Sequence, residues 1–140
     1  MKALIKIKSI QRHEGAEDTI ELMTTGSFEK SETGWRIFYS ETDEEKNVTD
    51  VEVTVEEDSV KILRKTGEVQ SLLIVEKGNK HFCSYNTHFG ALTVGIFGTK
   101  LESRITKLGG YIRLCYSIDI NSAYSGENEI GIRIKSKEEA

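Results

Sequence analysis

Alternation of apolar and polar side chains, the mark of a half-buried β-strand, is clearest in the stretch YIRLCYSIDIN, residues 111–121. Even-numbered positions from Ile112 to Ile120 are aliphatic or aromatic, whereas Arg113, Ser117 and Asp119 fall on the opposite face. Such a pattern is typical of antiparallel strands that cover a core with one side only. The stretch therefore predicts a long strand of an all-β protein.

The same period of two recurs along the rest of the chain, and turn residues such as Gly, Asn and Asp separate the apolar segments. No segment of ten or more residues keeps a helical period. Because the turns are short, neighbouring strands are expected to be antiparallel. The predicted strands are Ala3–Gln11, Glu17–Phe28, Trp35–Glu41, Asn47–Glu56, Val60–Lys65, Val69–Glu76, Lys80–Asn86, Phe89–Leu101 with a continuation after a bend as Glu102–Lys107, Tyr111–Asn121 and Glu127–Lys135.

A sheet with this many twisted strands tends to curl and close on itself. We therefore predict an antiparallel up-and-down β-barrel of about eight to ten strands. One domain over residues 1–140 is expected, since a chain of this length buries enough surface to fold without a disulfide or a metal. Gly26 predicts a bend in the second strand, and Gly90, Gly95 and Gly98 predict bends or bulges in the eighth.

The composition, with 37% hydrophobic and 30% charged residues, is typical of a water-soluble protein. The formal net charge is −4 and the basic residues are scattered among acidic ones, which argues against a nucleic-acid partner. No apolar run reaches the roughly 18 residues of a membrane span. Lys6 and Lys8 interrupt the apolar start that a signal peptide would need. We therefore expect a cytoplasmic protein with no membrane partner, in which Cys83 and Cys115 are reduced thiols.

Several short polar motifs occur in a definite order along the chain. They are TTG at residues 24–26, YSE at 39–41, RKTG at 64–67, YNTHFG at 85–90 and Asn128 before the last Ile-rich strand. In order and spacing this arrangement resembles the YwiB-like family of small bacterial proteins, a domain of unknown function, over essentially the whole chain. The resemblance implies a calycin-like barrel, shaped like lipocalins and fatty-acid-binding proteins, and a source among the Firmicutes. It implies no activity, and the lipocalin Gly-x-Trp signature is absent, because Gly34 and Trp35 are adjacent.

Five polar residues of this set fall at or near strand ends: Tyr39, Glu41, Arg64, Tyr85 and Thr87. In a barrel, strand ends and their loops form the mouth, through which ligands commonly enter. Glu41 and Arg64 are expected to form an ion pair, with Tyr85 and Thr87 close by. One interpretation is a polar ligand held at the mouth, and the other is a structural network that ties loops to the rim.

A catalytic or metal site has little support in the sequence. His81 and Cys83 share one face of a strand, and His88 or Cys115 could add a third ligand, but no CxxC or HxxxH spacing occurs. Nothing in the sequence orients His81 toward Cys83 as a general base would require. We therefore predict no catalytic residue, no metal site and no cofactor.

The aromatic residues Trp35, Phe38, Phe82, Phe89 and Phe97 could fill the barrel or line a cavity, and filling is the default expectation.

The sequence is compatible with three functions. The first is a barrel that binds a small molecule inside or at its mouth. The second is a non-catalytic interaction module that forms homodimers through Leu72–Val75, a segment that is apolar on both faces. The third and weakest is an enzyme, which would require the histidines and a cysteine to converge.

Overall fold

The computed structural model describes residues 1–87 and 90–137, apart from the side chains of residues 84–87 and 91. Its described residues form ten antiparallel strands in one sheet, ordered β6-β5-β4-β3-β2-β1-β10-β9-β8-β7. The predicted antiparallel meander is confirmed, and the first and last strands meet at its centre. The strands are β1 (Lys2–His13), β2 (Ala16–Lys30), β3 (Trp35–Thr42), β4 (Val48–Val55), β5 (Ser59–Thr66), β6 (Val69–Glu76), β7 (Lys80–Thr87), β8 (Gly90–Thr106), β9 (Gly109–Ile120) and β10 (Ala123–Ser136).

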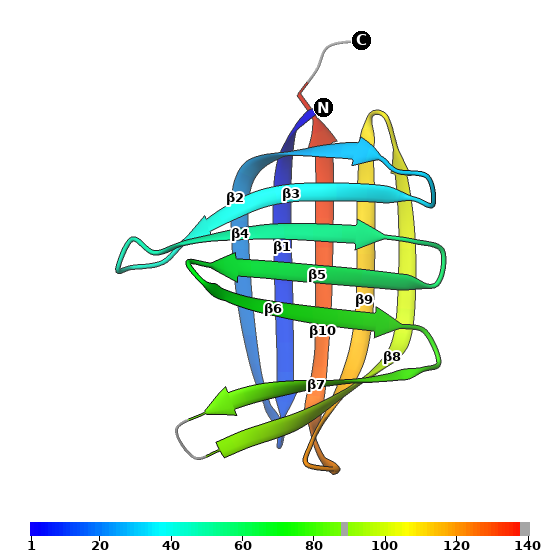
Figure 1. The fold of residues 1–140 in the computed structure, drawn as a ribbon. Helices are drawn as coiled ribbons and strands as arrows, with labels where there is room; N and C mark the ends of the chain where they lie inside the picture. The colour runs from blue at the N-terminus through cyan, green and yellow to red at the C-terminus, as the bar shows by residue number, and fades with distance from the viewer. Residues whose placement is uncertain (88–89, 138–140) are drawn as a thin grey trace.

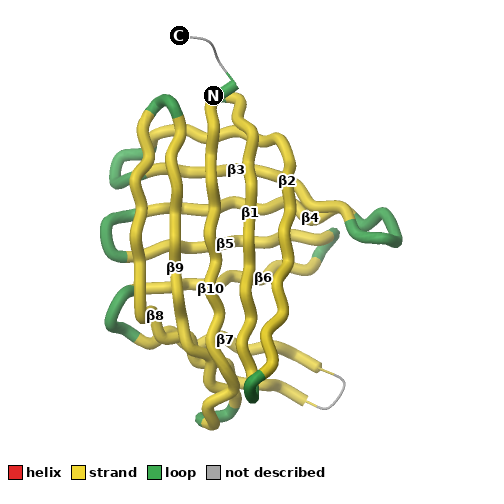
Figure 2. The backbone as a smooth tube through the Cα atoms, turned by 180° about the vertical axis from the view of Figure 1, so that it is seen from behind, coloured by secondary structure: helices red, strands yellow, loops and turns green. Residues whose placement is uncertain are grey.

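The sheet folds into two crossing layers. In Figure 1 the strands β3 to β6 run across the view, in front of β1, β2, β9 and β10, which run nearly upright. Figure 2 shows the upright layer from behind. Near-perpendicular crossing of two layers requires strands that bend from one layer into the other.

Gly26 allows this bend in β2. A Cβ atom at this position would lie 2.1 Å from the Phe38 carbonyl oxygen and 2.7 Å from Ile5 Cδ1. Residues 26–30 pair with β3, whereas residues 16–25 of β2 pair only with β1. The predicted bend at Gly26 is therefore confirmed. From residue 25 back to residue 16, β2 diverges from β3.

The barrel is nearly closed, with a seam between β6 and β7. Among the described residues the two strands stand at the two ends of the sheet order. Beside the seam there are two isolated bridges, one within the connecting turn, Glu76 with Asn79, and one from that turn to β8, Lys77 with Gly98. The Gly78 amide donates to the Gly98 carbonyl at 2.9 Å. A Cβ atom on Gly98 would lie 2.4 Å from the Glu76 carbonyl oxygen, so closure at this point requires glycine. The register of β8 against β9 also shifts at Gly98, as a bulge predicts.

The buried core lies at the end of the barrel near the chain termini, which we call the packed end. Phe28 is fully buried there and packs against Trp35 in a tilted arrangement, with ring centroids 5.7 Å apart. Aliphatic side chains from both layers surround it: Ile5, Ile37, Val53, Val60, Val75, Ile112, Leu114, Ile132 and Ile134. We call the opposite end, which carries the turns at residues 14–15 and 121–122, the open end.

The expectation that the listed aromatic rings fill the barrel is wrong for Phe38 and Phe82, whereas Trp35 packs against the core. Phe82 is 68% exposed, and Phe38 lies under the Arg36 guanidinium on the outer face. Phe82 faces outward because it stands between His81 and Cys83, which take the inward positions of β7. Phe89 lies outside the described residues. The buried rings are instead Phe28, Tyr39 and Tyr116.

Most strand boundaries lie within two residues of the prediction, but β10 starts at Ala123, four residues early, with a bulge between Tyr124 and Gly126. The predicted continuation of the eighth strand after residue 101 is part of β8, which runs to Thr106. Among residues 1–87 and 90–137, no helix is long and apolar enough to cross a membrane.

Candidate ligand-binding cavity at the open end

The inward-facing side chains change from apolar to polar as each strand approaches the open end. On β1 the series runs from Ile5 and Ile7 to Ser9 and Gln11, and on β5 it ends with Arg64. Since the same change occurs on neighbouring strands, the polar groups gather in one place. They are Ser9 and Gln11 on β1, Glu41 on β3, Thr49 on β4, Arg64 on β5, Ser71 on β6 and Asn128 on β10.

These side chains line two adjoining hollows inside the barrel. One, of about 370 Å³, reaches from Arg64 and Ser71 to isoleucines on β8, β9 and β10. The other, of about 400 Å³, lies where β2 diverges from β3 and is bordered by Leu22 and Glu41. Ser9, Gln11 and Arg64 line both hollows. Small-molecule sites in proteins commonly occupy about 300–1,000 Å³, so each hollow has room for a small ligand.

An ion pair between Glu41 and Arg64 lies at the junction of the hollows. Arg64 Nη1 donates to Glu41 Oε1 at 3.0 Å and to Oε2 at 2.9 Å. The two residues stand on β3 and β5, so their side chains reach over β4, whose Thr49 lies opposite Glu41. Thr49 and Thr66 in turn share a hydroxyl hydrogen bond of 2.6 Å. The predicted pairing of Glu41 with Arg64 is thus confirmed.

Two buried tyrosines border the ion pair. Burial raises the pKa of Tyr39 to about 12, the Arg64 charge opposes this shift, and the Glu41 charge adds to it. Burial also raises the pKa of Tyr116, against the hydrogen bond from Asn128 and the charge of Arg64. Asn128 Nδ2 donates to the Tyr116 hydroxyl oxygen at 3.2 Å. Both phenols are therefore neutral at physiological pH and can donate or accept hydrogen bonds.

The structure brings together three of the five predicted site residues: Tyr39, Glu41 and Arg64. Tyr85 and Thr87 occupy β7 positions opposite Leu92 and Gly90, and their side chains lie outside the described part of the chain.

Sequence reasoning missed several cavity residues. Alternation predicts Tyr116 only as a core residue, and Asn128 enters only through the family motifs. The missed signal was available: a polar residue that continues an apolar inward series by one more step of two, as Asn128 does before Ile130, Ile132 and Ile134.

The candidate metal ligands do not converge among the described residues. His81 Nε2 lies 3.2 Å from Glu76 Oε1, and Cys83 Sγ donates to the Val94 carbonyl at 3.7 Å. Cys115 lies on the outer face, where burial raises the pKa of its thiol. No group of three or more His, Cys, Asp or Glu side chains suited to a metal occurs in the described ranges. His88 lies outside them.

Comparison with known proteins bears on family and fold. The model of a domain of unknown function, DUF1934, matches residues 5–132. The crystal structure of the YwiB protein from Bacillus subtilis is similar with a TM-score of 0.81 and 20% sequence identity, over 98% of this chain and 92% of that chain. At this identity the likeness shows the fold alone, and it agrees with the antiparallel barrel. No curated protein matches the chain.

Proposed function

Since the chain belongs to the DUF1934 family and keeps a part-polar cavity inside its barrel, we propose that it binds a small, neutral, amphipathic molecule at the open end. The observation that supports this most directly is the change of the inward series from apolar to polar at one end of the barrel. Packing alone would favour apolar residues at those of these positions that are partly buried, such as Ser9, Ser71 and Asn128.

The lining suggests how such a ligand is oriented. Isoleucines on β5, β8, β9 and β10 offer an apolar wall, of which Ile62, Ile96 and Ile130 are buried members. Ser71 and Arg64 offer hydrogen-bonding groups on the facing layer. The apolar part of the ligand would lie on the isoleucine wall and its polar group would lie near Arg64.

Charge favours a neutral ligand over an anion. Glu41 already neutralises Arg64, so a carboxylate ligand would have to displace Glu41 and leave a half-buried carboxylate without its partner. Losing one partner of such a pair is costly, because the remaining charge keeps its desolvation penalty. A hydroxyl or amide group can bind the same site while the ion pair stays intact.

A fluorescent probe tests this proposal. 1-Aminoanthracene, a neutral aromatic amine, should bind saturably, and 1-decanol should displace it at about tenfold lower concentration than decanoate does. Ser71→Phe fills the cavity and should weaken probe binding by about tenfold or more. Gln70→Phe is the matched control, because Gln70 is the neighbouring exposed residue of the same strand. Binding that is absent, or equal in both variants, would contradict the proposal.

The state of the two cysteines bears on where the protein resides in the cell. Cys83 and Cys115 are both free thiols, which fits a reducing compartment such as the cytoplasm.

As a second candidate function, β6 could pair two copies of the chain, since Leu72 is 44% exposed beside Leu63 and the seam leaves the β6 edge largely unpaired. Sedimentation velocity would then show a dimer that Leu72→Lys abolishes and Gln70→Lys preserves. A monomer at all concentrations would exclude it.

A further inference from the structure

The outer face of the upright layer carries a row of cations with one aromatic ring among them. The strand register places Lys6 on β1 beside Arg133 on β10, Arg133 beside Tyr111 on β9, and Tyr111 beside Arg104 on β8. We call these four residues the basic row. All four side chains are exposed, and Tyr111 is 39% exposed.

The basic row differs from the neighbouring cations in having no acidic partner. Next to it, Lys8 pairs with Glu21 at 3.9 Å, Arg113 with Glu129 at 2.6 Å, and Lys100 with Glu102 at 3.4 Å. In contrast, Lys6, Arg104 and Arg133 make no ion pair with any residue that the structure describes. Glu21, Glu129 and Glu102 are thus held by other cations, and the positive charge of the row remains available.

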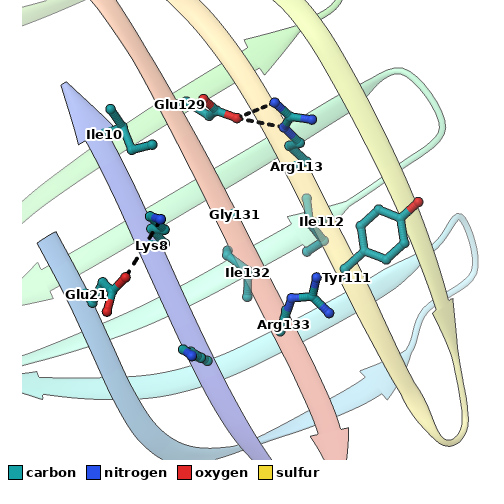
Figure 3. Close-up of a pocket in the computed structure, with 11 residues that line it drawn as sticks. Lys8, Ile10, Glu21, Tyr111, Ile112, Arg113, Glu129, Gly131, Ile132 and Arg133 are labelled. Atoms are coloured by element: carbon teal, nitrogen blue, oxygen red, sulfur yellow. Dashed lines mark hydrogen bonds and ion pairs between the residues drawn. The ribbon is translucent and has the colours of Figure 1, made fainter. Parts of the chain in front are cut away.

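A shallow hollow adjoins the row at Gly131. A Cβ atom on Gly131 would meet nothing within 4 Å, so the missing side chain leaves open space between Lys8 and Arg113. Figure 3 shows Lys8, Arg113 and Arg133 around this position. The hollow has a volume of about 300 Å³ and is also lined by Lys6 and Tyr111.

The spread of the charges selects the kind of partner. Neighbouring strands lie about 4.8 Å apart, so the row across four strands extends over roughly 14 Å. A single phosphate cannot contact cations at both ends of such a row, whereas a chain of phosphates can. An exposed aromatic ring between two arginines offers a surface on which a base can stack. No other strand lies in front of this layer in Figure 2, so the row is accessible from outside the barrel.

We propose that the basic row binds single-stranded nucleic acid, with Lys6, Arg104 and Arg133 on successive phosphates and a base stacked on Tyr111. The net charge of −4 argued against such a partner, but it averages over a molecule whose acids are paired or lie elsewhere. The row and the interior cavity lie on opposite faces of the same sheet, so this proposal is independent of the ligand proposed for the cavity.

Fluorescence anisotropy with a labelled oligothymidylate or oligouridylate of about 15 nucleotides tests the proposal. Contacts with three phosphates predict a log–log salt slope of about −2. Arg133→Glu should weaken binding by about tenfold or more, and Tyr111→Leu should weaken it at least about fivefold through lost stacking. Lys65→Glu is the control, since it makes a similar charge change at an exposed residue on β5, in the other layer.

Each other outcome overturns the proposal. No binding at about 50 mM salt does so directly. Equal losses in Arg133→Glu and Lys65→Glu would show a response to net charge alone. If Tyr111→Leu binds as the parent does and heparin competes equally, the row is a general polyanion surface without stacking. If phosphatidylglycerol vesicles bind in an Arg133-dependent way and oligonucleotides do not, the partner is a membrane surface.

Discussion

The packed end and the open end of the barrel are built by the same strands with opposite results. At the packed end, β1, β9 and β10 contribute Ile5, Leu114 and Ile132, each almost completely buried. At the open end the same three strands contribute Gln11, Ile118 and Asn128, which remain partly exposed around a cavity. The packed end therefore supplies most of the apolar burial that stabilises the fold. This allows the open end to carry polar side chains that would not be favoured in a packed core.

The largest difference between the ends should appear on truncation of an isoleucine. Ile132→Ala removes a side chain that is 1% exposed and should lower the free energy of unfolding by about 3 kcal/mol, since it opens a void in packed surroundings. Ile118→Ala removes a side chain that already borders a cavity and should cost about 1 kcal/mol. Urea unfolding measures both values. Equal losses would show that the open end is as tightly packed as the other.

Glycine substitutions probe the bend that creates the opening. Gly26→Ala forces a Cβ against the Phe38 carbonyl and should destabilise the protein by about 1–3 kcal/mol. Gly131→Ala, where a Cβ would meet nothing within 4 Å, should change stability by less than about 1 kcal/mol and serves as the control. Thermal unfolding compares the two variants. A harmless Gly26→Ala would mean that β2 does not need a tight corner to leave the upright layer.

The sequence predicted the packed end better than the open end, for physical reasons. Alternation shows which side of a strand faces inward, and it places Ile112 and Leu114 correctly without knowledge of the partner strands. The contact of Glu41 with Arg64 could be expected because strand ends converge at a barrel rim. The seam between β6 and β7 could not be predicted. The barrel closes there through a close approach of Gly98 to Glu76, and these two residues lie far apart in the sequence.

At the open end, the Glu41–Arg64 ion pair should contribute modestly to stability. Its side chains are 31% and 40% exposed, so water screens part of the attraction. A double-mutant cycle with Glu41→Gln and Arg64→Met should give a coupling free energy of about 0.5–1 kcal/mol. The more exposed pair of Lys8 and Glu21, 3.9 Å apart, should give about 0.2 kcal/mol. If the two cycles give the same coupling free energy, the open end is as fully hydrated as the outer surface.

The effect that is smallest at neutral pH, where it vanishes, concerns Tyr39, whose pKa is raised from 10.0 to about 12. Between these two values the unfolded chain loses the phenol proton while the folded chain keeps it. Stability from this group is therefore complete below pH 10 and is lost as the pH rises toward 12. Tyr39→Phe should flatten this decline, as urea midpoints measured at increasing alkaline pH would show.

Substitutions of the ion pair refine the same measurement. The Glu41 charge raises the pKa of Tyr39 and the Arg64 charge lowers it. Glu41→Gln should therefore shift the ionisation of Tyr39 to lower pH, and Arg64→Met should shift it to higher pH, as ultraviolet absorbance of the phenolate would report. Shifts in these opposite directions would show that both charges act on a phenol shielded from water. If neither variant moves the titration, water reaches Tyr39 and the boundary between the two ends lies deeper in the barrel.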